Sequence, residues 1–177
     1  TLLAKLYILS EKMPFENNKG ICVLTHTNVA IDIIKNKLGD KANQLLSYPN
    51  FFGTIQSFVD KYLAIPAYIK CFGYRLKYID NDFFYTKLKK YEIRISNNSW
   101  INNNKGSYEN NVDFVADIDI NFTSLGKNAF VLECGLKNKS SDTYKSIENI
   151  FGKIFTDGYI RYKDAYELGK LYIYNIP

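Results

Sequence analysis

Two short apolar runs, each followed at once by polar residues and a helical pattern, constrain the fold of this chain more than any other feature. Residues 21–24 are continuously apolar, as in a parallel strand that is buried on both faces. Thr27 and Asn28 follow with side chains suited to capping, and apolar residues then recur at four-residue spacing toward Gly39, a residue type typical of helix C-caps. The sequence therefore predicts a buried strand that leads directly into an amphipathic helix.

The same order of strand and helix is repeated further along the chain. Residues 51–54 have the pattern of a second short strand, and residues 55–63 carry apolar side chains at the i, i+3, i+4, i+7 and i+8 positions of a helix. We expect this helix to end before Pro66, because proline interrupts helical hydrogen bonding. Together with an amphipathic helix over residues 2–13, this alternation predicts an α/β fold built on a parallel sheet.

Polar residues stand where each predicted strand gives way to its helix, the place where open α/β sheets bind ligands. These residues belong to the runs Leu24-Thr25-His26-Thr27-Asn28 and Gly53-Thr54-Ile55-Gln56-Ser57-Phe58. The first run resembles motif Ia of the UvrD/Rep-type superfamily 1 DNA helicases, and the second resembles motif Ib. The order and separation of the two runs also agree with that family.

Both ends of the chain extend the resemblance. Residues 1–6 resemble the helix that follows the Walker A loop in this family, although the sequence contains no G-x-x-x-x-G-K-[ST]. Residues 158–166 resemble the segment that leads to motif II, and the sequence ends at Pro177 before any Asp-Glu pair of that motif. The resemblance therefore implies an internal fragment of the N-terminal motor domain of an ATP-dependent DNA helicase.

In fold, the resemblance implies a partial P-loop NTPase (RecA-like) parallel sheet that is interrupted by an inserted α+β subdomain. Residues 1–66 would belong to motor domain 1A, residues 67–157 to a 1B-like insertion, and residues 158–177 to the return toward motif II. ATP and Mg²⁺ would be cofactors of the intact protein, with none expected for the fragment alone. Single-stranded DNA would be the partner, and a likeness of residues 53–73 to helicase subunits of the Gabija type adds a possible nuclease subunit.

The expected DNA-contacting residues come from the two motif-like runs and are neutral polar side chains. Hydroxyl and amide groups can hydrogen-bond phosphate, helix N-termini favour anions, and an imidazole can stack on a base. The expected set is Thr25, His26, Thr27, Asn28, Thr54, Gln56 and Ser57. Two alternatives stay open at this point: Thr27 and Asn28 only cap a helix, or the chain is a non-catalytic nucleic-acid or protein-binding module on a P-loop-like sheet.

The second half of the chain has a different pattern. Residues 96–111 are rich in asparagine and predict a loop. Alternating apolar residues over 112–122, followed by a turn and residues 129–136, predict an antiparallel hairpin. Further helices are expected over residues 82–91, over residues 144–155 with a cap near Ser141 or Asp142, and over residues 164–174.

The predicted hairpin also suggests a competing function. Asp113, Asp117 and Asp119 would share one strand face, Glu133 could approach them from the next strand, and a carboxylate cluster can bind Mg²⁺ for nuclease chemistry. The simpler interpretation is the solvated face of an amphipathic strand. The lysine expected two residues after the glutamate of such a nuclease is absent, which makes the nuclease the less favoured hypothesis.

Composition adds three expectations. The net charge of +5 suits a phosphate-facing surface. Cys22, Cys71 and Cys134 form neither a metal-spaced pair nor a disulfide framework, which indicates a reducing, cytoplasmic environment. No apolar run approaches the roughly 20 residues that a membrane span needs, so no membrane partner is expected.

Overall fold

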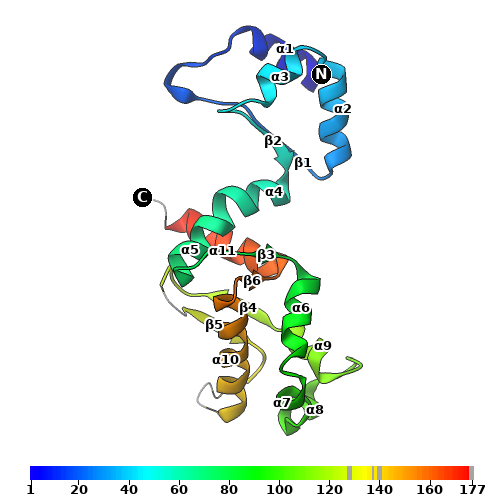
Figure 1. Cartoon of the computed structure of the whole chain (residues 1–177), viewed down its shortest axis with the longest axis vertical. Coiled ribbons are helices and arrows are strands. Elements are labelled where there is room, and N and C mark those ends of the chain that lie inside the picture. Colours follow the sequence, from blue (N-terminus) through cyan, green and yellow to red (C-terminus); the bar gives the residue numbers. More distant parts are fainter. Residues whose placement is uncertain (127–128, 137, 139–140, 176–177) are drawn as a thin grey trace. The chain divides into compact units, whose positions relative to one another are not determined.

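The computed structural model describes residues 1–126, 129–136, 138 and 141–175 of the chain, which has a mixed α/β fold (Figure 1). The chain divides into two compact units, Thr1–Phe58 and Val59–Pro177. The division into residues 1–66, 67–157 and 158–177 that the helicase resemblance implies stays a prediction.

The first unit contains a two-stranded parallel sheet and the helices that precede, join and follow its strands. Its elements are α1 (Leu2–Glu11), η1 (Glu16–Asn18), β1 (Cys22–Thr25), α2 (Asn28–Leu38), α3 (Lys41–Leu46), β2 (Phe51–Thr54) and α4 (Ile55–Val59), which runs on past the unit boundary. Strand β1 pairs with β2 in parallel, with Cys22 opposite Phe51 and Thr25 opposite Thr54. The prediction that these two strands are neighbours in a parallel sheet is therefore confirmed.

The core of the first unit lies on one face of this sheet. Its buried members are Leu6 of α1, Val23 of β1 and four apolar residues of α2 and α3, namely Ile34, Leu38, Ala42 and Leu45. On the opposite face Cys22 is exposed and Leu24 is 43% exposed, so the prediction of a strand buried on both faces is wrong. The reason is that strand side chains alternate between faces, and the clustered helices cover only the face that carries Val23.

The helix after β2 continues beyond Pro66, contrary to the expected stop. It runs from α4 through the π-helical segment η2 (Asp60–Ala64) into α5 (Ile65–Phe72), and it ends at Gly73 in the left-handed conformation. In the widened turn the Ile65 N–H bonds to the carbonyl of Asp60, five residues back. Pro66 therefore falls in the first turn of α5, where a missing N–H is tolerated.

The second unit combines helices with two further two-stranded sheets. After α5 its elements are β3 (Tyr78–Ile79), α6 (Asn81–Lys89), α7 (Glu92–Ser96), α8 (Ser99–Asn104), α9 (Asn111–Ala116), β4 (Asp119–Phe122), β5 (Phe130–Glu133), α10 (Asp142–Thr156), β6 (Tyr159–Ile160) and α11 (Tyr162–Tyr174). Strands β3 and β6 pair in parallel, and β4 and β5 pair antiparallel. The predicted antiparallel hairpin and the helices near residues 82–91, 144–155 and 164–174 are confirmed, with Ser141 as the N-cap of α10.

The first part of the predicted strand over residues 112–122 is a helix, α9. The Asn110 side chain accepts a hydrogen bond from the Asp113 N–H at 2.9 Å, which caps the helix start. Val112 and Val115 are both buried three residues apart, so the apolar spacing served a helix as well as a strand. Only residues 119–122 adopt the strand, and β5 is correspondingly shorter than the predicted 129–136.

The predicted loop over residues 96–111 contains the helix α8. Its N-cap is Asn98, whose side chain accepts from the Ile101 N–H at 3.0 Å. Ile101 is buried, and the Asn111 side chain donates to the carbonyl of Ile95 at 3.3 Å. The asparagines of this segment thus act as helix caps and as links between helices, a role that composition alone did not indicate.

Aromatic side chains form much of the core of the second unit. Phe155 is fully buried and its ring contacts those of Phe72, Phe84 and Phe151. The hydroxyl of the buried Tyr68 donates to the carbonyl of Phe155, and burial, followed by the charge of Asp157, raises the pKa of Tyr68 to about 12. Among the helices that the structure describes, none has the length and apolarity to cross a membrane.

Candidate nucleic-acid interface

The parallel pairing of β1 and β2 brings the two motif-like runs to the same edge of the sheet. Both strands end at the register pair Thr25 and Thr54, and each is followed within three residues by a helix. This is the edge of a parallel sheet at which ligands of α/β proteins bind. The structure therefore gathers the seven predicted site residues into two neighbouring turns.

The turn after β1 is held by its threonines. The Thr25 hydroxyl donates to the carbonyl of Thr27 at 2.9 Å, and the Thr27 hydroxyl accepts from the Ala30 N–H at 3.3 Å. Thr27 is thus the N-cap of α2, as the capping alternative predicted, and its hydroxyl is partly committed to that role. Asn28 is the first residue of the helix and not its cap, and it is exposed together with His26.

The turn after β2 is held by a reciprocal pair of hydroxyls. The Thr54 hydroxyl donates to the Ser57 Oγ at 3.1 Å and accepts from the Ser57 N–H at 3.1 Å, while the Ser57 hydroxyl donates to the Thr54 carbonyl at 2.8 Å. Gly53 makes this folding back possible, since a Cβ at that position would lie 2.7 Å from the Ser57 Oγ and 2.8 Å from the Phe51 Cζ. Gln56 is half-buried beside this turn.

These two turns can offer neutral hydrogen-bond donors and acceptors and one exposed imidazole. His26, Thr27, Asn28 and Ser57 are the exposed members of the set, whereas Thr25, Thr54 and Gln56 are half-buried. The first N–H groups of α2 add donors, since an N-cap side chain satisfies only part of the first turn. Such a surface suits the oxygens of a phosphodiester backbone and the faces of unpaired bases better than it suits acid–base chemistry.

The acidic residues considered for a nuclease are not arranged as that hypothesis required. Asp113 lies on α9, Asp117 is the C-cap residue of that helix, and only Asp119 lies on β4, where it stands opposite Glu133. The prediction of three acids on one strand face is wrong because α9 replaces the first half of that strand. In the part of the chain that the structure describes, no three His, Cys, Asp or Glu side chains are placed to hold a metal ion.

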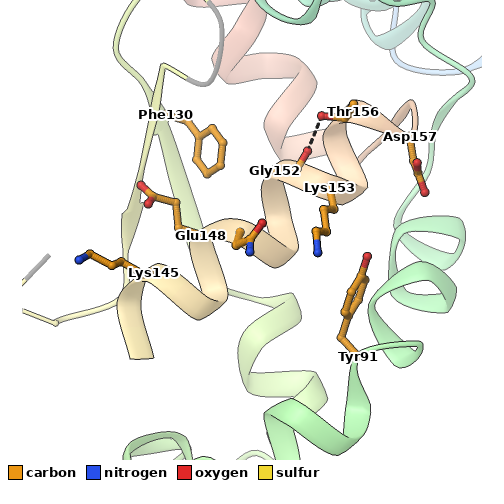
Figure 2. Close-up of a pocket in the computed structure, with 9 residues that line it drawn as sticks. Tyr91, Phe130, Lys145, Glu148, Gly152, Lys153, Thr156 and Asp157 are labelled. Carbon is orange, nitrogen blue, oxygen red and sulfur yellow. Dashed lines mark hydrogen bonds between the residues drawn. The ribbon is translucent and has the colours of Figure 1, made fainter. Parts of the chain in front are cut away.

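The second unit contains concave sites that the sequence analysis did not identify. One, of about 590 Å³, lies along the polar stripe of α10 and is bordered by Tyr91 and Phe130 (Figure 2). Lys145, Glu148 and Lys153 line it, and the Thr156 hydroxyl donates to the carbonyl of Gly152 at its edge at 2.7 Å. The regular spacing of these polar residues was the available signal, but that spacing is also typical of any solvated helix face.

Comparison of the chain with models of protein families, with curated proteins and with solved structures finds no match. The class that the structure establishes is therefore a mixed α/β protein with small parallel and antiparallel sheets.

Proposed function

We propose that this chain is part of the N-terminal motor domain of a UvrD/Rep-type ATP-dependent DNA helicase, in which it contributes contacts to single-stranded DNA. The observation that carries the proposal is the parallel register that places Thr25 opposite Thr54, because it brings the two motif-like runs to one sheet edge. A partial RecA-like sheet requires this arrangement, and the parallel pairing of β1 and β2 supplies it. The proposal includes the division into 1A-like and 1B-like parts and a cytoplasmic location.

The chemistry of the two turns supports contact with unpaired nucleotides. The exposed His26 imidazole offers a flat ring for stacking, and Asn28 and Ser57 offer hydrogen bonds to phosphate. None of the seven side chains carries a fixed charge, so these residues would position the strand while lysines elsewhere supply the salt-dependent part of the affinity.

The test is a titration of labelled single-stranded oligonucleotide at two salt concentrations. His26→Ala should weaken binding by about 1–3 kcal/mol if the imidazole stacks on a base, with an unchanged salt dependence because no charge is lost. Asn28→Ala should weaken binding less. Asn43→Ala is the matched control, since it removes an equally exposed amide from α3 of the same unit.

Equal affinity of all three variants and the unaltered chain would contradict the assignment of these turns. Absence of single-strand binding by the unaltered chain would favour the alternative, a binding module for other partners. ATP and Mg²⁺ belong in this proposal to the Walker A loop and motif II of the intact protein. The 177 residues themselves should therefore bind no ATP at micromolar concentration in calorimetry. A nuclease subunit as a further partner rests only on the Gabija-type likeness.

A further inference from the structure

A second concave site on the Val59–Pro177 unit is lined by aspartates and tyrosines, whereas a phosphate-binding surface is expected to be rich in lysine and arginine. It has a volume of about 610 Å³ and lies between α6, α9 and the start of α11. Helices α6 and α9 contact each other directly, and Figure 1 shows them as neighbours. Sites of this volume are large enough to take an amino-acid side chain or a small molecule.

Three tyrosines and the buried Phe84 form the aromatic part of the lining. Tyr85 comes from α6, and Tyr162 and Tyr166 stand one turn apart on α11. Tyr162 and Tyr166 are each 40% exposed, so each presents ring surface to solvent. The face of a tyrosine ring attracts a cation that lies within about 6 Å of its centroid.

The two cations that line the site are already neutralised. The Arg161 guanidinium is buried and forms a bidentate pair with Asp164, with N–O distances of 2.8 and 2.6 Å. The Lys163 ammonium lies 3.4 Å from a carboxylate oxygen of Asp117 and 2.8 Å from one of Asp119. Neither cation is available to balance further acids in the site.

Two carboxylates of the lining are left without a cationic partner in the described part of the chain. The carboxylate oxygens of Asp113 accept from the Tyr85 hydroxyl at 2.7 Å and from the Asn110 amide at 2.8 Å, both neutral donors. Asp82 stands exposed in the first turn of α6. The Lys89 ammonium already lies over the Tyr85 ring, 4.8 Å from its centroid. The site therefore combines uncompensated negative charge with the exposed faces of Tyr162 and Tyr166, in a chain whose net charge is +5.

We propose that this site binds the guanidinium group of an arginine side chain from a protein partner. A guanidinium is planar, stacks on aromatic faces and donates to carboxylates in a fork, whereas an ammonium offers only a point charge. The site, the ligand and the partner differ from those of the proposed DNA contacts, which lie in the other unit. Failure of one proposal therefore leaves the other untouched.

The test uses the full chain and follows backbone amide resonances by NMR while N-acetyl-arginine amide is added. Saturable shifts should centre on Tyr85, Asp113 and Tyr166, with a dissociation constant on the order of 1–10 mM that weakens as salt is raised. The matched ligand is the citrulline analogue, which keeps the planar group but has no charge, and it should bind at least about fivefold more weakly.

Substitutions give effects of opposite sign. Asp82→Asn should weaken arginine binding about twofold to fivefold, and Asp142→Asn, which alters the first-turn aspartate of α10, should leave it unchanged. Lys163→Gln should tighten binding by a similar factor, because it releases Asp117.

The tyrosines are tested by removing the ring and then only its hydroxyl. Tyr166→Ala should weaken binding about twofold to fivefold, whereas Tyr166→Phe and the control Tyr174→Ala should not. The proposal is overturned if no saturable shifts centre on the site, if citrulline produces the same shifts at the same concentrations, or if Lys163→Gln weakens binding.

Discussion

Replacing Asp164 by alanine should strongly destabilise the Val59–Pro177 unit. Asp164 and its partner Arg161 have side chains that are only 1% and 4% exposed. The carboxylate accepts three hydrogen bonds from Arg161, from its backbone N–H at 3.0 Å, from Nε at 2.8 Å and from Nη2 at 2.6 Å. The substitution would remove all three at once.

The rest of the Arg161 environment prevents its charge from reaching water. Its Nη1 donates to the carbonyls of Ala116 and Ile118 at 2.6 and 2.8 Å, and the guanidinium lies 4.9 and 5.2 Å from the ring centroids of Phe84 and Phe151. An unpaired charge held in such a position costs about 3–5 kcal/mol of folding stability. With a urea m-value of about 2 kcal/mol/M, the unfolding midpoint should fall by about 1.5–2.5 M.

The chain contains a single tryptophan, which makes the measurement specific. Trp100 lies on α8, and its ring centroid is 5.9 Å from that of Phe114 on α9, so its fluorescence reports on the second unit. The control is Glu167→Ala, which breaks the exposed pair with Lys170, whose N–O distance is 2.7 Å. This control should cost less than about 1 kcal/mol. An Asp164→Ala midpoint no lower than that of the control would refute the reasoning.

Three further predictions concern protonation, thiol reactivity and backbone approach. The hydrogen bond from the Tyr108 hydroxyl, and to a smaller extent the charge of Lys163, lowers the pKa of Asp117. The contribution of the ionised Asp117 carboxylate to folding stability is therefore present above the ordinary carboxyl pKa of about 4 and is lost as the pH falls through the lowered pKa. The urea midpoints of Tyr108→Phe and the unaltered chain should therefore converge on acidification. Burial raises the pKa of Cys71 to about 11, so a thiol reagent at pH 8 should label the other two cysteines first. The number of thiols labelled in this fast phase should be the same in Cys71→Ser as in the unaltered chain. Gly53→Ala should destabilise the first unit by about 1–3 kcal/mol in thermal unfolding, because the new Cβ would meet the Ser57 side chain, whereas Gly39→Ser, where the site is open, should act only through its positive φ.

The two strands of the first unit and the helix α2 could be predicted because several local signals agreed there. The strand ending at Thr25 combines an apolar run with a cap residue, Thr27, and the spacing of the following helix matches the cap. The exposure of Leu24 could not be predicted in the same way, because it depends on which face the helices cover and not on the strand itself.

Local signals disagreed over residues 112–116 of the second unit, and there the prediction of a strand was wrong. Residues 112–116 alternate as a strand does, but Asn110 supplies a helix cap and the buried valines are three residues apart. A short apolar run satisfies both periods, so the cap decides the outcome. A high asparagine content favours a loop over residues 96–111, but in the structure asparagine caps two helices in this region, at Asn98 and at Asn110.

The tyrosine and aspartate site between α6, α9 and α11 shows why net charge is a poor guide to any one surface. The chain has an excess of lysine and arginine, which by itself favours a positively charged surface. In the folded chain, Arg161 forms an ion pair with Asp164, three residues away. Lys163 forms ion pairs with Asp117 at the end of α9 and with Asp119 of β4. The acids of the site that remain without a cationic partner in the described part of the chain are Asp82 and Asp113, and their charge has the opposite sign to the net charge of the chain. The electrostatic character of the site is therefore set by which ion pairs the tertiary fold completes, a quantity that neither composition nor periodicity contains.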